Sequence, residues 1–99
     1  MANKSIKQKI WEYMRRNRLF EVQIILEILD IKQTTLNAYL NPLEKAGYIK
    51  RHSGNHRLLS RSYRLLKDTG IKSPSYKKQM LHDHNTGKKH DLSNIQLNS

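Results

Sequence analysis

The stretch that decides the fold covers residues 30–66 and reads DIKQTTLNAYLNPLEKAGYIKRHSGNHRLLSRSYRLL. Between residues 33 and 46, apolar Leu36, Leu40 and Leu43 recur at i, i+4 and i+7. This period predicts an amphipathic helix with one face in the core. The opposite face carries small or amide side chains without charge: Thr34, Asn37, Ala38 and Asn41. Such a face can approach the base edges in a DNA groove closely.

The end of this helix carries a second signal. Gly47 follows the last periodic residue, where a glycine can take the left-handed conformation of a C-terminal cap. The ending LEKAGYI, residues 43–49, resembles the end of the recognition helix in winged helix-turn-helix regulators, the broad family of the MarR and ArsR types. The resemblance covers residues 5–66. It implies an α+β fold, mainly helical, with three helices and a two- or three-stranded antiparallel sheet that carries a hairpin wing.

Two positions depart from the family pattern. Lys32 stands where a serine or aspartate often caps the recognition helix, so the cap must come from elsewhere, with Asp30 and Thr34 as candidates. Pro42 lies inside the helix, where it removes one amide donor and crowds the preceding turn. Either the helix kinks there, or a fresh turn begins with Asn41 as its N-cap.

The remaining elements of the domain follow from periodicity, turn signals and the resemblance. They are a first helix from Ser5 to about Asn17, a strand over residues 19–21, a second helix over residues 22–29, and wing strands over residues 48–52 and 62–66. We expect the wing tip at residues 53–55, because Gly54 and Asn55 tolerate the backbone conformations of tight turns. Four aromatic residues are expected in the core: Trp11, Phe20, Tyr39 and Tyr63.

The charge of the chain favours a polyanionic partner. It has 19 Lys and Arg against 8 Asp and Glu, a formal net charge of +11, and such proteins attract nucleic acids. Residues 50–67 are basic without an acid, whereas residues 21–31 are acidic without a base. We therefore expect phosphate contacts from Lys32, Lys50, Arg51, His52, Asn55, His56, Arg57, Arg61 and Arg64. We expect base contacts from Gln33, Thr34, Thr35, Asn37, Ala38 and Asn41.

Several classes of function are not expected. A chain of 99 residues has a small core with little room for a substrate pocket, and we find no nucleophile signature, phosphate loop or paired carboxylates. The chain has no cysteine, and the His and Asp residues at positions 82–84, 90 and 91 lack helical metal-ligand spacing. We expect no catalysis, cofactor, metal or small-molecule substrate. The longest mostly apolar run, residues 22–31, is too short for a membrane span, and the N-terminal stretch has neither the apolar run nor the cleavage site of a signal peptide. The absence of cysteine fits a reducing cytosol, and we expect a protein of the bacterial cytoplasm that is associated with the nucleoid.

The sequence divides near residue 70. Residues 1–70 form the expected DNA-binding domain, and residues 71–99 are expected to be a polar, basic and largely flexible tail. A short helix over residues 75–82 is an alternative for part of the tail, with Tyr76, Met80 and Leu81 as a small apolar patch. Leu92, Ile95 and Leu97 form a second weak patch. Residues 63–74 also resemble the exit from the wing in small winged-helix proteins of bacteriophages and mobile elements.

Three hypotheses follow for function. The first is a sequence-specific transcriptional regulator, a repressor of a phage or mobile element, that places residues 33–41 in the major groove of double-stranded DNA and its wing on phosphates. The second is a non-specific or architectural nucleic-acid binder that assists recombination or replication. The third is a protein-interaction module. Regulators of this class usually read two half-sites as dimers, so a homodimer is also left open.

Overall fold

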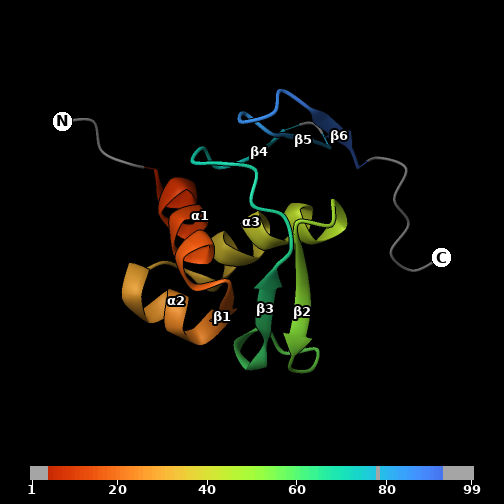
Figure 1. Ribbon diagram of the computed structural model, residues 1–99. Helices are drawn as coiled ribbons and strands as arrows, with labels where there is room; N and C mark the ends of the chain where they lie inside the picture. The colour runs from red at the N-terminus through yellow and green to blue at the C-terminus, as the bar shows by residue number, and fades with distance from the viewer. Residues whose placement is uncertain (1–4, 78, 93–99) are drawn as a thin grey trace.

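The computed structural model describes residues 5–77 and 79–92, and its architecture is α+β (Figure 1). Its elements are α1 (Ile6–Asn17), β1 (Leu19–Glu21), α2 (Val22–Leu29), α3 (Gln33–Lys45), β2 (Ile49–Ser53), the 3-10 turn η1 (Leu58–Ser60), β3 (Ser62–Leu65), β4 (Ser75–Lys77), β5 (Met80–His82) and β6 (Lys89–Asp91). The described ranges thus contain three α-helices and two three-stranded antiparallel sheets.

The three helices lie where the apolar periods predict them. Ser5 caps α1 as expected, because its Oγ accepts a hydrogen bond from the Gln8 amide at 3.1 Å. In the apolar stripe of α1, Ile10, Trp11 and Met14 are fully buried, whereas Ile6 at its start is exposed. Helix α2 has the predicted bounds. At the start of α3 no side chain caps the helix: Lys32 holds the N-cap position through its backbone, and neither Asp30 nor Thr34 forms a side-chain hydrogen bond to the described residues.

The C-terminal end of α3 is closed by a Schellman motif. Gly47 has φ +83°, the amide of Tyr48 donates to the Leu43 carbonyl at 2.9 Å, and the amide of Gly47 donates to the Glu44 carbonyl at 3.1 Å. The helix continues through Pro42, so the alternative of a fresh turn capped by Asn41 is wrong. Pro42 and Leu43 are both buried, and this packing holds the last turn despite the missing amide donor.

The first sheet has the strand order β1-β3-β2. The short strand β1 pairs with β3 as predicted, with Phe20 opposite Tyr63, and both rings are buried. The connection between β2 and β3 is longer than the tip predicted at residues 53–55, since it includes η1. Gly54 has φ +105° and lies so close to the backbone of Ser60 that a Cβ would come within 2.5 Å of its carbonyl oxygen. The connection is therefore a folded loop rather than a tight turn.

The second sheet, with the order β4-β5-β6, replaces the expected short helix over residues 75–82, which is wrong. Gln79 takes a positive φ of 63° between β4 and β5 and turns the chain back on itself. Leu81 is buried while its neighbours in β5 are half-buried, which is the alternation of a strand. Residues Ile95 and Leu97 of the second patch lie outside the described residues.

The second sheet packs on the same core as the helices. Leu81 and Leu92 belong to one cluster of buried side chains with those of α1, α3 and the first sheet. The hydroxyl of buried Tyr48 donates to Asp83 Oδ2 at 2.5 Å and lies 3.0 Å from His90 Nε2. The expected tail thus contains the three strands β4, β5 and β6, and Leu81 and Leu92 join the core of the expected domain.

Candidate nucleic-acid interface

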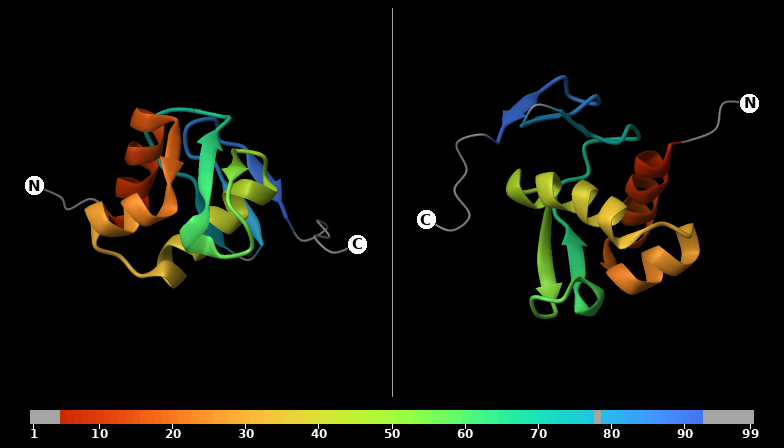
Figure 2. Two further views of the ribbon diagram at one scale, coloured as in Figure 1. Left: turned by 90° about the horizontal axis from the view of Figure 1, so that it is seen from below. Right: turned by 180° about the vertical axis from the view of Figure 1, so that it is seen from behind.

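The outward face of α3 is the first part of the candidate site. Gln33, Thr34, Ala38 and Asn41 are exposed, and Thr35 and Asn37 are half-buried, whereas the leucines of the same helix are buried. Figure 2 shows α3 lying between the two sheets, with the β2–β3 hairpin on one side and the second sheet on the other. All six residues expected to contact bases therefore reach the surface on one helix, and none of them carries a charge.

The outer face of the β2–β3 hairpin is the second part. Lys50 and Arg64 are direct partners across the strand pair and both are exposed. Two like charges in such positions repel one another and destabilise the sheet. Neither side chain forms an ion pair within residues 5–77 and 79–92. Together with Arg51, His52 and Leu66 they line a hollow of about 350 Å³, which is a basic surface open to a phosphate group.

The hairpin loop uses two of the expected phosphate-binding residues to hold its own shape. The Arg61 guanidinium donates to the carbonyls of Asn55 and His56, both at 2.9 Å, and to the Tyr63 hydroxyl at 3.3 Å. Asn55 Oδ1 accepts from the Arg57 amide at 2.8 Å and from the Ser60 hydroxyl at 2.9 Å. Arg61 and Asn55 thus position the loop. These contacts, and the hydrogen bonds of Ser60, are not predictable from the charge pattern.

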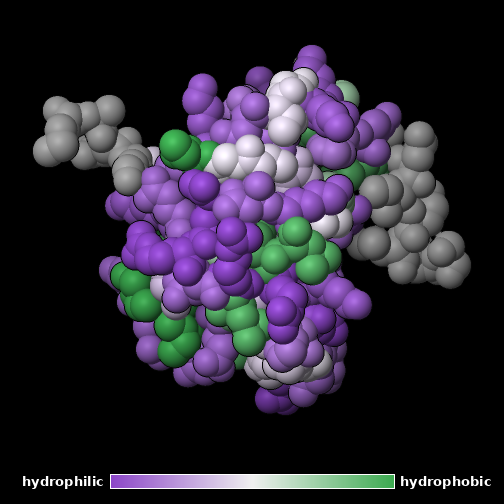
Figure 3. Space-filling model, viewed as in Figure 1, coloured by the Kyte–Doolittle hydropathy of each residue, from purple (hydrophilic) through white to green (hydrophobic). Residues whose placement is uncertain are grey.

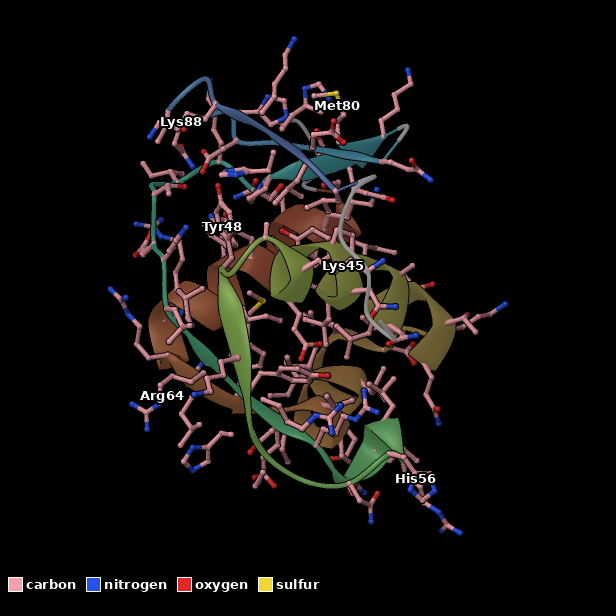
Figure 4. The ribbon with its side chains drawn as sticks, turned by 90° about the vertical axis from the view of Figure 1, so that its right-hand side faces the viewer. Lys45, Tyr48, His56, Arg64, Met80 and Lys88 are labelled. Atoms are coloured by element: carbon pink, nitrogen blue, oxygen red, sulfur yellow. The ribbon has the colours of Figure 1, made fainter. Side chains whose placement is uncertain are left out.

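The same loop lies beside the N-terminal end of α3. Gln33 lines a hollow of about 540 Å³ together with residues 57–60 of the loop. His56 and Arg57 are exposed, and His56 stands at the far end of the hairpin while Arg64 stands along its side (Figure 4). The exposed Lys32 directly precedes the helix. Cationic side chains therefore border the uncharged face of α3 at its N-terminal end.

The C-terminal half of α3 is bordered by the second sheet, where a flexible tail or a short helix was expected. Tyr76 of β4 lines a hollow of about 290 Å³ with Ala38, Asn41, Pro42 and Lys45 of α3. The ring of Tyr76 is 39% exposed. Tyr76 and Met80 stand at helical spacing, and that spacing favoured the wrong element.

A buried polar cluster fixes the second sheet to the helical core. Burial raises the pKa of Asp83, but hydrogen bonds from Tyr48, Thr69 and the amides of Asn85 and Thr86 outweigh this effect and hold the pKa below its usual value. Burial, together with the adjacent Asp83 carboxylate, raises the pKa of Tyr48 well above its usual range. Both groups thus keep the ionisation state that their hydrogen bond requires at neutral pH.

Several acidic side chains lie apart from this basic surface. Glu21, Glu27 and Asp30 are exposed on α2 and its ends, and Asp68 pairs with Arg15 at 2.7 Å and with Arg18 at 3.3 Å. Figure 3 shows hydrophobic residues at the surface over α2 and β1, with further patches elsewhere, on a face that is largely hydrophilic. Exposed cations thus line the hairpin and the N-terminal end of α3, while three of the exposed acids lie on α2 and its ends.

Comparisons with protein-family models, with curated proteins and with solved structures give no match. Within the described residues, no helix has the length and apolar character that crossing a membrane requires. The same residues contain no group of three or more His, Cys, Asp or Glu side chains placed to hold a metal ion. The case for a function therefore depends on the geometry and charge of the surface around α3.

Proposed function

We propose that this protein is a sequence-specific regulator that binds double-stranded DNA through a winged helix-turn-helix. In this proposal α3 is the recognition helix in the major groove, and the β2–β3 hairpin is the wing on the phosphates. The element order helix, strand, two helices and two strands, with β3 in the middle of the sheet, supports this assignment. The likeness of residues 63–74 to small phage proteins extends the proposal to a repressor of a phage or mobile element.

One juxtaposition carries the proposal. The uncharged face of α3 stands next to a hairpin on which Lys50 and Arg64 face each other without an acidic partner in the described residues. A phosphate between two such cations relieves their repulsion, and each phosphate neutralised releases counterions. The uncharged face can then meet base edges, where Asn side chains favour adenine and a threonine methyl favours thymine. Phosphate contacts position the helix, and base contacts select the sequence.

The salt dependence of binding tests where the phosphates lie. For the parent protein, log affinity for a mixed-sequence duplex should fall steeply with log salt, with a slope of about 0.9 per phosphate contacted. The double variant Lys50→Ala/Arg64→Ala should have a slope that is lower by about 1 to 2 units. The matched control is Lys88→Ala/Lys89→Ala, which removes the same charge from the β5–β6 loop and the start of β6, away from the hairpin (Figure 4).

The two double variants separate a hairpin contact from general attraction by a cationic protein. A slope that falls only in the hairpin variant supports the proposal. Equal falls in both variants would mean that net charge alone drives binding, which would contradict the wing assignment. If the parent protein has no measurable affinity for DNA at low salt, the proposed function as a whole is wrong.

A further inference from the structure

Tyr76 occupies an unusual place in the second sheet. It is a direct partner of Leu81, which is in turn a partner of His90, so these three side chains share the sheet face that packs on the core. Leu81 is buried under this face, but Tyr76 stands on the edge strand and remains 39% exposed. The ring therefore extends beyond the core and overhangs α3.

The surroundings of Tyr76 are those of a nucleotide contact. The hollow that it lines on α3 contains the exposed side chains of Ala38 and Asn41, both on the uncharged face, and the half-buried Lys45. Lys45 has no ion pair within the described residues. An aromatic ring, an amide and an unpaired ammonium group thus border one hollow at the C-terminal half of the helix.

The strand that carries Tyr76 is held firmly in place. Trp11 Nε1 donates to the Gly70 carbonyl at 2.9 Å, and the Ser73 amide donates to Gln8 Oε1 at 2.9 Å. Buried Leu81 and the Tyr48–Asp83 hydrogen bond fix the next strand. A site built on elements positioned in this way keeps its geometry when a ligand arrives.

We infer that β4 forms a second flank of the DNA interface, on the side of α3 away from the β2–β3 hairpin. Lys45 contacts a phosphate there, and the ring of Tyr76 packs on the deoxyribose of the same strand. This inference rests on the proposed function and adds a second set of backbone contacts to it. An α-helix fills the major groove, which is about 12 Å wide, so a strand of the duplex borders each side of the helix. Contacts on both sides fix its register.

The test uses the full chain and a mixed-sequence duplex, because contacts to phosphate and sugar do not depend on sequence. Lys45→Ala should lower the slope of log affinity against log salt by about 0.9, the value for one phosphate. Tyr76→Ala should lower affinity by about three- to tenfold and leave the slope unchanged, since it removes an aromatic contact and no charge. Tyr76→Phe keeps the ring and should bind as the parent does.

Lys88→Ala is the matched control, because it removes one lysine from the β5–β6 loop, far from Lys45 (Figure 4). It should leave the slope close to that of the parent. If Tyr76→Ala melts at a much lower temperature than the parent, the salt slope of Lys45→Ala still tests the inference. This variant should remain folded, because alanine is a good helix former and the lysine lies in the last turn of α3.

Three results are distinguishable. If Lys45→Ala lowers the slope and Lys88→Ala does not, β4 and the end of α3 form the second flank. The inference is overturned if the parent binds DNA, Lys45→Ala has the same salt slope as the parent, and folded Tyr76→Ala has the same affinity as the parent. The proposed function then still stands. If the parent does not bind DNA, the proposed function fails, and this inference fails with it.

Discussion

Removing the hydroxyl of Tyr48 tests how firmly the second sheet is attached to the helical core. This hydroxyl donates to Asp83 Oδ2 at 2.5 Å, and both residues are about 1% exposed. A hydrogen bond to a charged group contributes about 1.5 to 3 kcal/mol. Tyr48→Phe should lose about that much free energy of unfolding at pH 7, measured by urea denaturation. For a domain of this size, the loss corresponds to a fall in Tm of roughly 6 to 24 °C.

The pH dependence of this loss identifies its cause. The folded-state pKa of Asp83 is lowered, so its contribution to stability is present above the unfolded pKa of about 3.9 and disappears as the pH falls through the folded-state value. The difference between parent and Tyr48→Phe should therefore shrink below about pH 4. In an Asp83→Asn background the difference should no longer depend on pH in this range. A Tyr48→Phe variant as stable as the parent at pH 7 would refute the reasoning.

Two further substitutions test other parts of the fold. Leu81→Ala should destabilise the protein by about 2 to 5 kcal/mol in urea denaturation, because Leu81 is buried in the shared core. The control Leu66→Ala, at an exposed position, should change stability by no more than about 0.5 kcal/mol. Equal small effects would mean that the second sheet is not part of the core. Gly54→Ala should lower the free energy of unfolding by about 1 to 3 kcal/mol and weaken DNA binding. The new Cβ would clash with the backbone of Ser60, and the φ of +105° is strained for alanine. An unchanged melting temperature would contradict the loop geometry.

The elements that sequence predicted well are those specified by local contacts. The leucines of α3 mark its buried face, Ser5 marks the start of α1, and Gly47 marks the end of α3 through a conformation that few other residues adopt. Each signal lies within a few residues of the structure that it predicts. Strand β1 has only three residues, and its prediction came from the resemblance to a family rather than from its own pattern.

The second sheet could not be predicted because its stability comes from residues far away in the sequence. Leu81 and Leu92 are isolated in a polar segment, and only the helical core buries them. Tyr76 and Met80 stand at a spacing that suits a helix, whereas the positive φ of Gln79, which separates the two strands, leaves no mark in the sequence.

The candidate site shows the same division. The outward face of α3 followed from helical periodicity, and the exposure of its residues agrees with that expectation. The part that Arg61 plays in the loop was not predictable, because the three groups that accept its hydrogen bonds converge only after the loop has folded. The hollow shared by Tyr76 and α3 was not predicted, because the fold brings together residues that are more than thirty positions apart in the sequence.

The most direct test of the central claim, that α3 reads sequence, compares two duplexes and two proteins. One duplex carries a site enriched by selection from randomised DNA, and the other has mixed sequence. Asn37→Ala should lose roughly 1 to 3 kcal/mol of affinity for the selected site, about 5- to 150-fold, and bind the mixed duplex as the parent does. Thermal melts should show both proteins folded. Equal losses on the two duplexes, or a selection that enriches no site, would contradict the claim and favour an architectural binder.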